Sequence, residues 1–132
     1  MNKKKFQKIA KEVLNLEIKA LQKLKKNINP SFNQAVYHIA ECQSKVILCG
    51  VGKSGIIASK ISATLSSVGT PSFNLSAGDS SHGDLGSISK KDILIMISNS
   101  GQTSELKNII QYANRNKKII LIAIVSKKNS LL

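Results

Sequence analysis

Hydrophobic residues in the first part of the chain recur every three or four positions, which is the spacing of an amphipathic helix. This pattern predicts a long helix over residues 3–27. Its apolar positions are Phe6, Ile9, Val13, Leu16, Ala20, Leu21 and Leu24. Asn29 and Pro30 break the pattern, and a second helical pattern runs from about residue 31 to residue 43. Two N-terminal helices are therefore expected before the first strand.

From Lys45 onward, short apolar runs alternate with segments of helical spacing. Strands are predicted at 46–49, 72–75, 92–97 and 118–125, and helices at 56–67 and 103–114. Alternation of strand and helix is typical of a parallel sheet that is covered by helices on both faces. The predicted fold is α/β, a three-layer αβα sandwich with a mostly parallel sheet and two preceding helices. We expect residues 1–44 to pack on a core domain formed by residues 45–132.

The length of 132 residues fits one globular domain. The longest apolar run, at 119–125, is far shorter than the roughly 20 residues of a membrane helix, and the lysine-rich start lacks the apolar stretch of a signal peptide. We therefore expect a cytoplasmic protein without membrane contacts. Cys42 and Cys49 have no Cys or His at metal-ligand spacing, so we predict two buried thiols and neither a disulfide framework nor a zinc site.

The chain is strongly basic, with a formal net charge of +13. Such a charge raises the possibility of nucleic-acid binding. However, the lysines of residues 1–29 lie between the apolar positions of the predicted helix, as expected of a solvent-exposed helix face. No aromatic residues are interleaved with the basic ones, although proteins that bind single-stranded nucleic acids need them. We therefore predict no nucleic-acid partner.

Two loops that follow predicted strands carry candidate chemistry. In open parallel sheets, ligands bind beyond the carboxyl ends of the strands, so these loops should converge. The first loop, Gly50–Gly55, allows a ligand to approach the backbone at a helix N-terminus. A triphosphate loop would need glycine at position 47, where Ile47 stands. The loop matches the dinucleotide pattern G-x-G-x-x-G, but no acidic residue ends the second strand, and a purely structural turn is the third alternative.

The second loop, residues 98–104, holds four hydroxyl and two amide side chains in seven residues. Ser and Thr often cap the N-terminus of a helix, but capping uses a single hydroxyl and leaves the others unexplained. Several hydroxyls and amides at a helix start can together bind a phosphate group. We therefore favour a phosphate site over capping alone.

The residues around these loops resemble the sugar isomerase (SIS) domain and, within that family, the arabinose-5-phosphate isomerases. The resemblance extends from Val46 to about Val125, and residues 5–44 look like the N-terminal helices of the family. It rests on four blocks in the order and spacing of the family, namely Gly52-Lys53-Ser54-Gly55, Gly69-Thr70-Pro71-Ser72-Phe73, His82-Gly83-Asp84-Leu85-Gly86 and Ile97-Ser98-Asn99-Ser100-Gly101.

The resemblance implies a cytoplasmic homo-oligomer, a tetramer in the family, which needs no cofactor. It would interconvert arabinose 5-phosphate and ribulose 5-phosphate through an enediolate and so supply Kdo for lipopolysaccharide. Lys53 and Glu105 match positions implicated in catalysis, and Gly69, Thr70 and His82 match positions that contact the substrate. Lys53 suits stabilisation of the enediolate, and Glu105 or His82 suits proton transfer. The phosphate group would be bound by Ser54, Ser98, Asn99, Ser100, Thr103 and Ser104.

The sequence also departs from the family pattern. Ser76 stands where relatives often have a zinc-binding His, so no metal is expected. Further catalytic residues, the last sheet elements and two CBS domains of the family would lie beyond Leu132, so we expect an incomplete domain with little or no turnover. A non-catalytic sugar-phosphate-binding or regulatory module is therefore the main alternative, and a dinucleotide-binding module is a third. The position of Glu105 in a first helical turn is also explained by the helix dipole alone.

Overall fold

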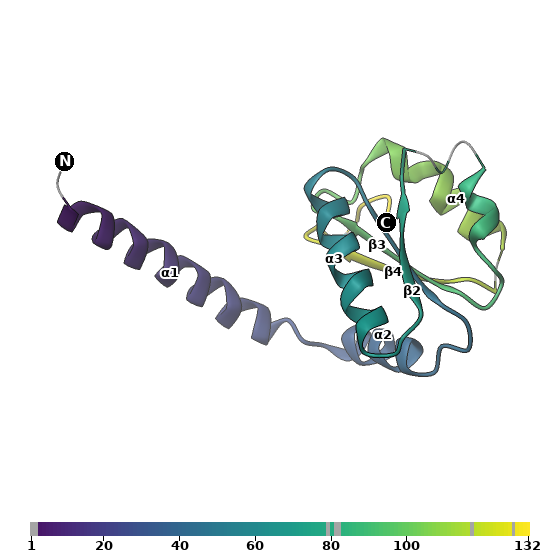
Figure 1. Ribbon diagram of the computed structural model, residues 1–132, viewed down its shortest axis with the longest axis horizontal. Coiled ribbons are helices and arrows are strands. Elements are labelled where there is room, and N and C mark those ends of the chain that lie inside the picture. The colour runs from purple at the N-terminus through teal and green to yellow at the C-terminus, as the bar shows by residue number, and fades with distance from the viewer. Residues whose placement is uncertain (1–2, 79, 81–82, 117, 128) are drawn as a thin grey trace. The chain divides into compact units, whose positions relative to one another are not determined.

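The computed structural model describes residues 3–78, 80, 83–116, 118–127 and 129–132 (Figure 1). Its α-helices are α1 (Lys3–Lys26), α2 (Pro30–Ala40), α3 (Lys53–Ser67) and α4 (Lys107–Arg115). Its strands are β1 (Val46–Gly50), β2 (Ser72–Ser76), β3 (Ile93–Ser98) and β4 (Ile120–Val125). Two 3-10 turns, η2 (Asp84–Ser87) and η3 (Ser104–Leu106), complete the described elements.

The four strands form one parallel sheet in the order β2-β1-β3-β4. Val46 of β1 pairs with Ser72 of β2 and with Ile93 of β3, and Ile93 pairs with Ile120 of β4. The two central strands are buried almost throughout, which explains why they appear in the sequence as unbroken apolar runs. The predicted parallel sheet is confirmed.

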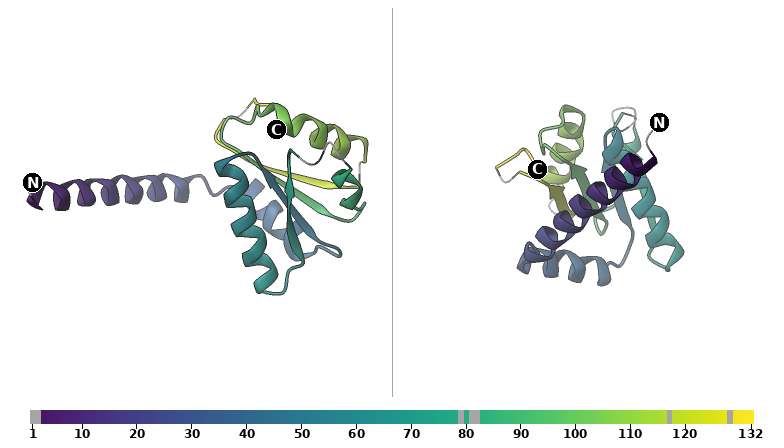
Figure 2. Two further views of the ribbon diagram at one scale, coloured as in Figure 1. Left: turned by 45° about the horizontal axis from the view of Figure 1, so that its top comes forward. Right: turned by 90° about the vertical axis from the view of Figure 1, so that its left-hand side faces the viewer.

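Alternate residues of the central strands pack against helices on opposite faces of the sheet. Ile47, Cys49, Leu94 and Met96 belong to a core cluster with Leu106, Ile109 and Ala113 of the η3–α4 segment. Val46, Leu48, Ile93 and Ile95 belong to a second cluster with Ala58, Ile61 and Leu65 of α3. Figure 2 shows the sheet between these two layers. The predicted three-layer αβα arrangement is therefore confirmed.

The chain divides into two compact units, residues 1–34 and 35–132. This division falls ten residues before the predicted boundary between 44 and 45. The physical reason is that Ile39, in the second half of α2, and Cys42 pack against the core cluster on the α3 side of the sheet. In the first unit, the described side chains of α1 are exposed.

Several element boundaries differ from the prediction. Helix α3 begins at Lys53 instead of residue 56, because Gly52 turns the chain with a positive φ of 57° directly before it. The helix predicted over 103–114 is divided into the 3-10 turn η3 and the α-helix α4. The turn η2 lies between the second and third predicted strands, in an interval for which no helix or strand was predicted.

The two cysteines differ in burial. Cys49 is fully buried in β1, and this burial raises the pKa of its thiol to about 11, although a hydrogen bond from the Gly50 backbone acts in the opposite direction. Cys42 is only half-buried, so the prediction of two buried thiols is correct for Cys49 alone. Both are free cysteines.

Candidate functional site

The loop between β1 and α3 brings the strand end and the helix start into close contact. A Cβ atom on Gly50 would lie 2.7 Å from the carbonyl carbon of Ser54, and one on Gly55 would lie 2.8 Å from the carbonyl oxygen of Gly50. No side chain caps the α3 N-terminus at Gly52. The first amide groups of a helix lack intrahelical partners, so the loop presents backbone donors at the carboxyl edge of the sheet.

We expect Gly50→Ala to destabilise the protein by about 2 kcal/mol, because the added methyl group would overlap with the α3 backbone and cannot be relieved by a side-chain rotation. Gly86→Ala is a matched control, since a Cβ there meets no atom within 4 Å and Gly86 has no positive φ. Urea unfolding of both variants measures the difference. Equal stabilities of the two variants would show that this contact is not tight in solution.

The serine loop, residues 98–104, is organised by its own hydroxyl groups. Ser98 is buried, and its Oγ accepts a hydrogen bond from the Gly101 amide (3.0 Å) and forms another with Thr103 Oγ1 (2.8 Å). The Oγ of exposed Ser100 accepts a hydrogen bond from the Gln102 amide (3.2 Å). No side chain caps η3 or α4. These hydroxyls therefore shape the loop, and capping does not account for them.

The segment after β4 packs on the serine loop. The amide of Leu131 donates to the carbonyl oxygen of Gly101 (3.0 Å), and the amide of Ser126 donates to that of Asn99 (3.3 Å). Gly101 has a positive φ of 67°, and a Cβ there would overlap with Ser130. The serine loop is thus fixed by hydrogen bonds within the loop and by hydrogen bonds from the segment after β4. These contacts fix the positions of its hydroxyl and amide groups at the edge of the sheet.

A cavity of about 510 Å³ lies between the glycine loop, the end of β2 and Glu105. Its lining includes Gly50–Gly52, Gly55, Asn74 and Glu105. The Glu105 side chain is exposed, and Ser104 Oγ donates a hydrogen bond to its Oε2 (2.8 Å). A hydrogen bond from its own backbone amide and the one from Ser104 lower the pKa of Glu105. The carboxylate is therefore ionised at neutral pH and able to accept a proton.

A second cavity, of about 330 Å³, joins Ser54 of α3 to Ser98 and Asn99 of the serine loop. Ile97, Ile124, Val125 and Ser126 complete its lining. Both cavities lie at the carboxyl edge of the sheet, as the parallel topology predicted. The structure thus brings together Ser54 with the serine loop, and Glu105 with the glycine loop.

Other predicted site residues lie elsewhere. Gly69 and Thr70 precede β2 and line a separate groove of about 340 Å³ with Val36 and Ile39, at the opposite edge of the parallel sheet. Their contact with substrate stays a prediction, and the geometry of a single chain does not support it. His82 lies outside the described residues.

Lys53 is the first residue of α3 and is exposed. It lies between Gly52 of the larger cavity and Ser54 of the smaller one, but it is not among the residues that line either cavity. A flexible side chain at this position can extend toward a ligand that occupies the sheet edge, so its catalytic role stays a prediction.

The cavity beside Glu105 also includes residues that the sequence did not single out. Asn74 on β2 and Ser59 on α3 add a side-chain amide and a hydroxyl to its lining. Asn74 is a polar residue between Phe73 and Leu75 of the strand. This polar position is the one feature of the sequence that could have indicated a place for Asn74 in the site. Ser59 has the ordinary appearance of a polar residue on a helix surface.

Two features are absent from the described residues. These residues contain no group of three or more His, Cys, Asp or Glu side chains that could hold a metal ion. In the same part of the chain, none of the helices has the length and apolar character required to cross a bilayer.

Comparison with known proteins identifies close relatives. The uncharacterized protein RP505 of Rickettsia prowazekii is 45% identical over 132 residues, which cover 100% of this chain and 41% of that protein. The arabinose 5-phosphate isomerase KdsD of Yersinia pestis is 44% identical over 125 residues, covering 95% of this chain and 38% of the isomerase. The chain therefore spans about two fifths of the length of these relatives.

A solved structure, that of c3406 from Escherichia coli CFT073 in complex with arabinose 5-phosphate, matches this chain with a TM-score of 0.83 and 38% identity. The match covers 98% of this chain and 69% of that one. The SIS domain profile matches residues 38–132, which include α3, α4 and all four strands. The chain therefore belongs to the SIS domain family.

Proposed function

We propose that this chain binds a pentose phosphate at the carboxyl edge of its sheet and takes part in the interconversion of arabinose 5-phosphate and ribulose 5-phosphate. The observation that carries the proposal is the position of the Glu105 carboxylate beside the glycine loop. The serine loop, whose hydroxyl and amide groups are suited to binding a phosphate group, directly precedes Glu105 in the chain. Two relatives support the choice of substrate, namely the arabinose 5-phosphate isomerase KdsD and c3406, whose structure holds arabinose 5-phosphate.

The phosphate group would occupy the cavity between Ser54 and the serine loop. Ser54 and Asn99 offer donors there, and the α3 N-terminus adds uncapped backbone amides. Hydrogen bonds to an anion are stronger than those between neutral groups, and the helix dipole adds to the attraction. Because Ser98 is bonded within the loop, we expect it to hold the loop in shape. Ser100 and Ser104 line neither cavity, but their hydroxyls are exposed, and we expect them to turn toward the ligand when it binds.

The isomerisation needs a base next to the first two sugar carbons. Removal of the proton from C2 of the aldose leaves an enediolate, and return of a proton to C1, with transfer of the hydroxyl proton from O2 to O1, yields the ketose. Glu105 is ionised and lines the larger cavity, so it is the base that we propose. Lys53 would stabilise the negative charge of the enediolate.

The resemblance to arabinose-5-phosphate isomerases extends the proposal to the cellular setting. We propose a cytoplasmic homo-oligomer, a tetramer as in the family, that works without a cofactor and supplies Kdo synthesis for lipopolysaccharide. A non-catalytic sugar-phosphate-binding module is the alternative. One observation favours it, since Glu105 lines the larger cavity but Lys53 lines neither of the two.

Calorimetric titration with arabinose 5-phosphate tests the phosphate site. We expect Ser100→Ala combined with Ser104→Ala to weaken binding about tenfold, because two hydrogen bonds to a charged group are lost. Ser98→Ala combined with Ser100→Ala should weaken it as well, through a change in loop shape, without unfolding the domain. Ser67→Ala, an exposed serine at the other end of α3, is the control.

Titrations with inorganic phosphate, NAD and duplex DNA separate the alternatives. Phosphate should compete with arabinose 5-phosphate, and NAD and DNA should not bind at the same site. Unchanged affinity in both serine double variants would refute the proposed phosphate site. Binding of arabinose 5-phosphate without any isomerisation by the chain would favour the non-catalytic module.

A further inference from the structure

A cavity of about 350 Å³ lies at the amino edge of the sheet, where the strands β3 and β4 begin. The described residues that line it are Lys90, Arg115, Asn116 and Lys118, and three of these carry a positive charge. The proposed pentose phosphate site lies at the carboxyl edge, beyond the other ends of the strands. This basic cavity is therefore separate from that site, and the proposed function does not use it.

The fold brings the basic residues together from three segments of the chain. Lys90 precedes β3 and Lys118 precedes β4, and these strands are parallel neighbours in which Ile93 pairs with Ile120. Helix α4 connects the end of β3 to the start of β4, so it ends, at Arg115, beside the starts of both strands. The parallel topology thus places three positive charges around one cavity.

Hydrogen bonds fix the backbone on two sides of the basic cavity. The Asp92 amide donates to the carbonyl oxygen of Ser89 (3.1 Å), which closes the turn that carries Lys90. At the end of α4, Nδ2 of Asn116 donates to the carbonyl oxygen of Tyr112 (2.9 Å). Because the backbone is already held in place, a ligand has only to order the exposed side chains, which lowers the entropic cost of binding.

The three cations of the basic cavity have no carboxylate partner among the described residues. The ion pairs there are Lys8–Glu12 and Lys45–Asp92. Asp92 lies close to Lys90 in the chain, but its carboxylate is buried and paired with Lys45 (2.8 Å). The three positive charges therefore repel one another around the cavity, and a bound anion would remove this repulsion.

The helix dipole explains only part of this arrangement. The C-terminal end of a helix is negative, which favours a cation such as Arg115 at the end of α4. Lys90 and Lys118 lie outside the helix, in the segments before two strands, so the dipole does not account for them. Asn116 Nδ2 also satisfies one of the last carbonyl groups of α4, which reduces the repulsion between the helix end and an anion.

We propose that the basic cavity binds a diphosphate group, either as free pyrophosphate or as part of a nucleoside diphosphate. The guanidinium group of Arg115 can donate two parallel hydrogen bonds to phosphate oxygens, and Lys90 and Lys118 add two further charges. A phosphomonoester carries a charge of about −1.5 to −2, which two cations balance. Three cations suit a ligand with a larger negative charge.

The lining also indicates which part of a nucleotide would be recognised. The described residues that line the basic cavity include no aromatic side chain on which a base could stack. Its polar groups are three cations and one amide, which are suited to phosphate oxygens. The diphosphate group, and not the nucleoside, is therefore the part of the ligand that this site binds.

Calorimetric titration with pyrophosphate, in magnesium-free buffer at physiological ionic strength, tests the basic cavity. We expect Arg115→Gln combined with Lys118→Gln to weaken binding about tenfold, because charge-assisted hydrogen bonds are lost. Arg115→Lys should cause a smaller loss, since it keeps the charge but cannot form the paired hydrogen bonds. Urea unfolding shows whether each variant retains its fold.

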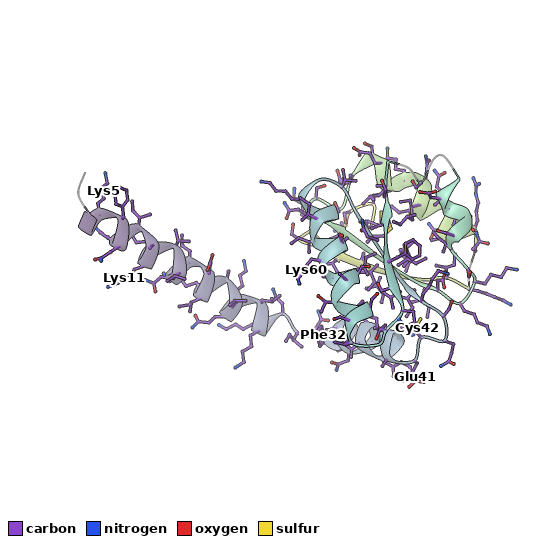
Figure 3. All side chains as sticks on the ribbon, in the orientation of Figure 1. Lys5, Lys11, Phe32, Glu41, Cys42 and Lys60 are labelled. Carbon is purple, nitrogen blue, oxygen red and sulfur yellow. The ribbon has the colours of Figure 1, made fainter. Side chains whose placement is uncertain are left out.

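Lys11→Gln combined with Lys60→Gln is the matched control. Both lysines are exposed, and Figure 3 shows them on α1 and α3. This variant removes the same net charge, and distant charges are screened at physiological ionic strength, so the affinity for pyrophosphate should change by less than about twofold. Equal losses in the two double variants would show that net charge alone attracts pyrophosphate, and would overturn the proposed site.

Titration with adenosine diphosphate distinguishes the two sources of the diphosphate group. Equal affinities for adenosine diphosphate and pyrophosphate, both weakened by Arg115→Gln combined with Lys118→Gln, would show that the diphosphate group alone is recognised. Tighter binding of adenosine diphosphate, weakened by the same variant, would make a nucleotide the ligand.

Further titrations separate this site from the pentose phosphate site. Pyrophosphate should still bind when Ser100→Ala is combined with Ser104→Ala, and arabinose 5-phosphate should keep its affinity when Arg115→Gln is combined with Lys118→Gln. Loss of pyrophosphate binding in the serine variant alone would place the ligand at the serine loop and overturn the inference. Absence of pyrophosphate binding to the unmodified chain would also overturn it, and duplex DNA binding that Arg115→Gln weakens would then assign the cations to nucleic acid.

Discussion

Replacement of Asp92 by Asn should lower the free energy of unfolding by about 3 kcal/mol. Asp92 lies directly before β3, and its side chain is fully buried. Lys45 Nζ lies 2.8 Å from Oδ2, the Ser89 amide donates to the same oxygen (2.6 Å), and Ser44 Oγ donates to Oδ1 (2.6 Å). The neutral amide keeps the shape of the carboxylate, but it leaves the partly buried Lys45 ammonium without its counter-charge and presents an N–H group to donors.

The same contacts predict how stability depends on pH. Burial alone would raise the pKa of Asp92, but the hydrogen bonds from Lys45, Ser44 and Ser89 and the charge of Lys45 outweigh it, and the pKa is lowered. Because the pKa in the folded state is below that of the unfolded state, the carboxylate stabilises the fold at neutral pH. This stabilisation is lost as the pH falls below about 4 and through the folded-state pKa.

Urea unfolding at pH 7 and at pH 3 measures both effects. The loss caused by Asp92→Asn should be large at pH 7 and smaller at pH 3, where the wild-type carboxyl group is itself becoming protonated. Asp84→Asn is the control, because Asp84 is exposed. If Asp92→Asn were as stable as Asp84→Asn at pH 7, the ion pair would contribute nothing measurable.

The sequence could not have predicted this group of contacts. It placed Asp92 at the start of a strand, but Ser44 and Lys45 are 48 and 47 residues earlier in the chain. Only the register between β1 and β3, which pairs Val46 with Ile93, brings the residues before these two strands together. Contacts of this kind depend on strand pairing, which a periodic pattern in one segment does not contain.

Other parts of the fold follow from local patterns. The strands β1 and β3 were predictable because both of their faces are buried, so nearly every residue is apolar. The 3-10 turn before the last helix could not be predicted, since Ser104, Glu105 and Leu106 are compatible with a 3-10 helix and with an α-helix. The boundary of the N-terminal region stays a prediction, since Ile39 has the same helical spacing as the residues before it, although it packs on the sheet.

In the candidate site, too, some features could be predicted from the sequence and others could not. Convergence of the loops at 50–55 and 98–104 follows from the parallel topology, and the structure places both at one edge. The internal bonds of Ser98 were not foreseeable, because they depend on how the loop folds back to Gly101 and Thr103. The separation of Gly69 from this edge follows from its position before a strand, a consequence that the resemblance of motifs does not reveal.

Lys53→Met should slow the isomerisation of arabinose 5-phosphate by about 100-fold, if Lys53 stabilises the enediolate as proposed. The expectation rests on its position as the first residue of α3, between the residues that line the two cavities. Methionine retains the length and flexibility of the side chain but removes the charge. Nuclear magnetic resonance in deuterated water measures both product formation and deuterium incorporation at the sugar carbons next to the carbonyl group.

Lys60→Met is the matched control, because Lys60 is an exposed lysine on the same helix, two turns further from the site. It changes the net charge and the helix composition in the same way, so a general effect of lost charge would appear in both variants. A rate that falls only for Lys53→Met, with unchanged affinity for inorganic phosphate, places the lysine at the enediolate. Equal rates in both variants would make Lys53 a solvent-exposed charge without a catalytic part. Absence of deuterium incorporation by the wild-type chain would agree with the little or no turnover expected from the sequence and would favour the non-catalytic module.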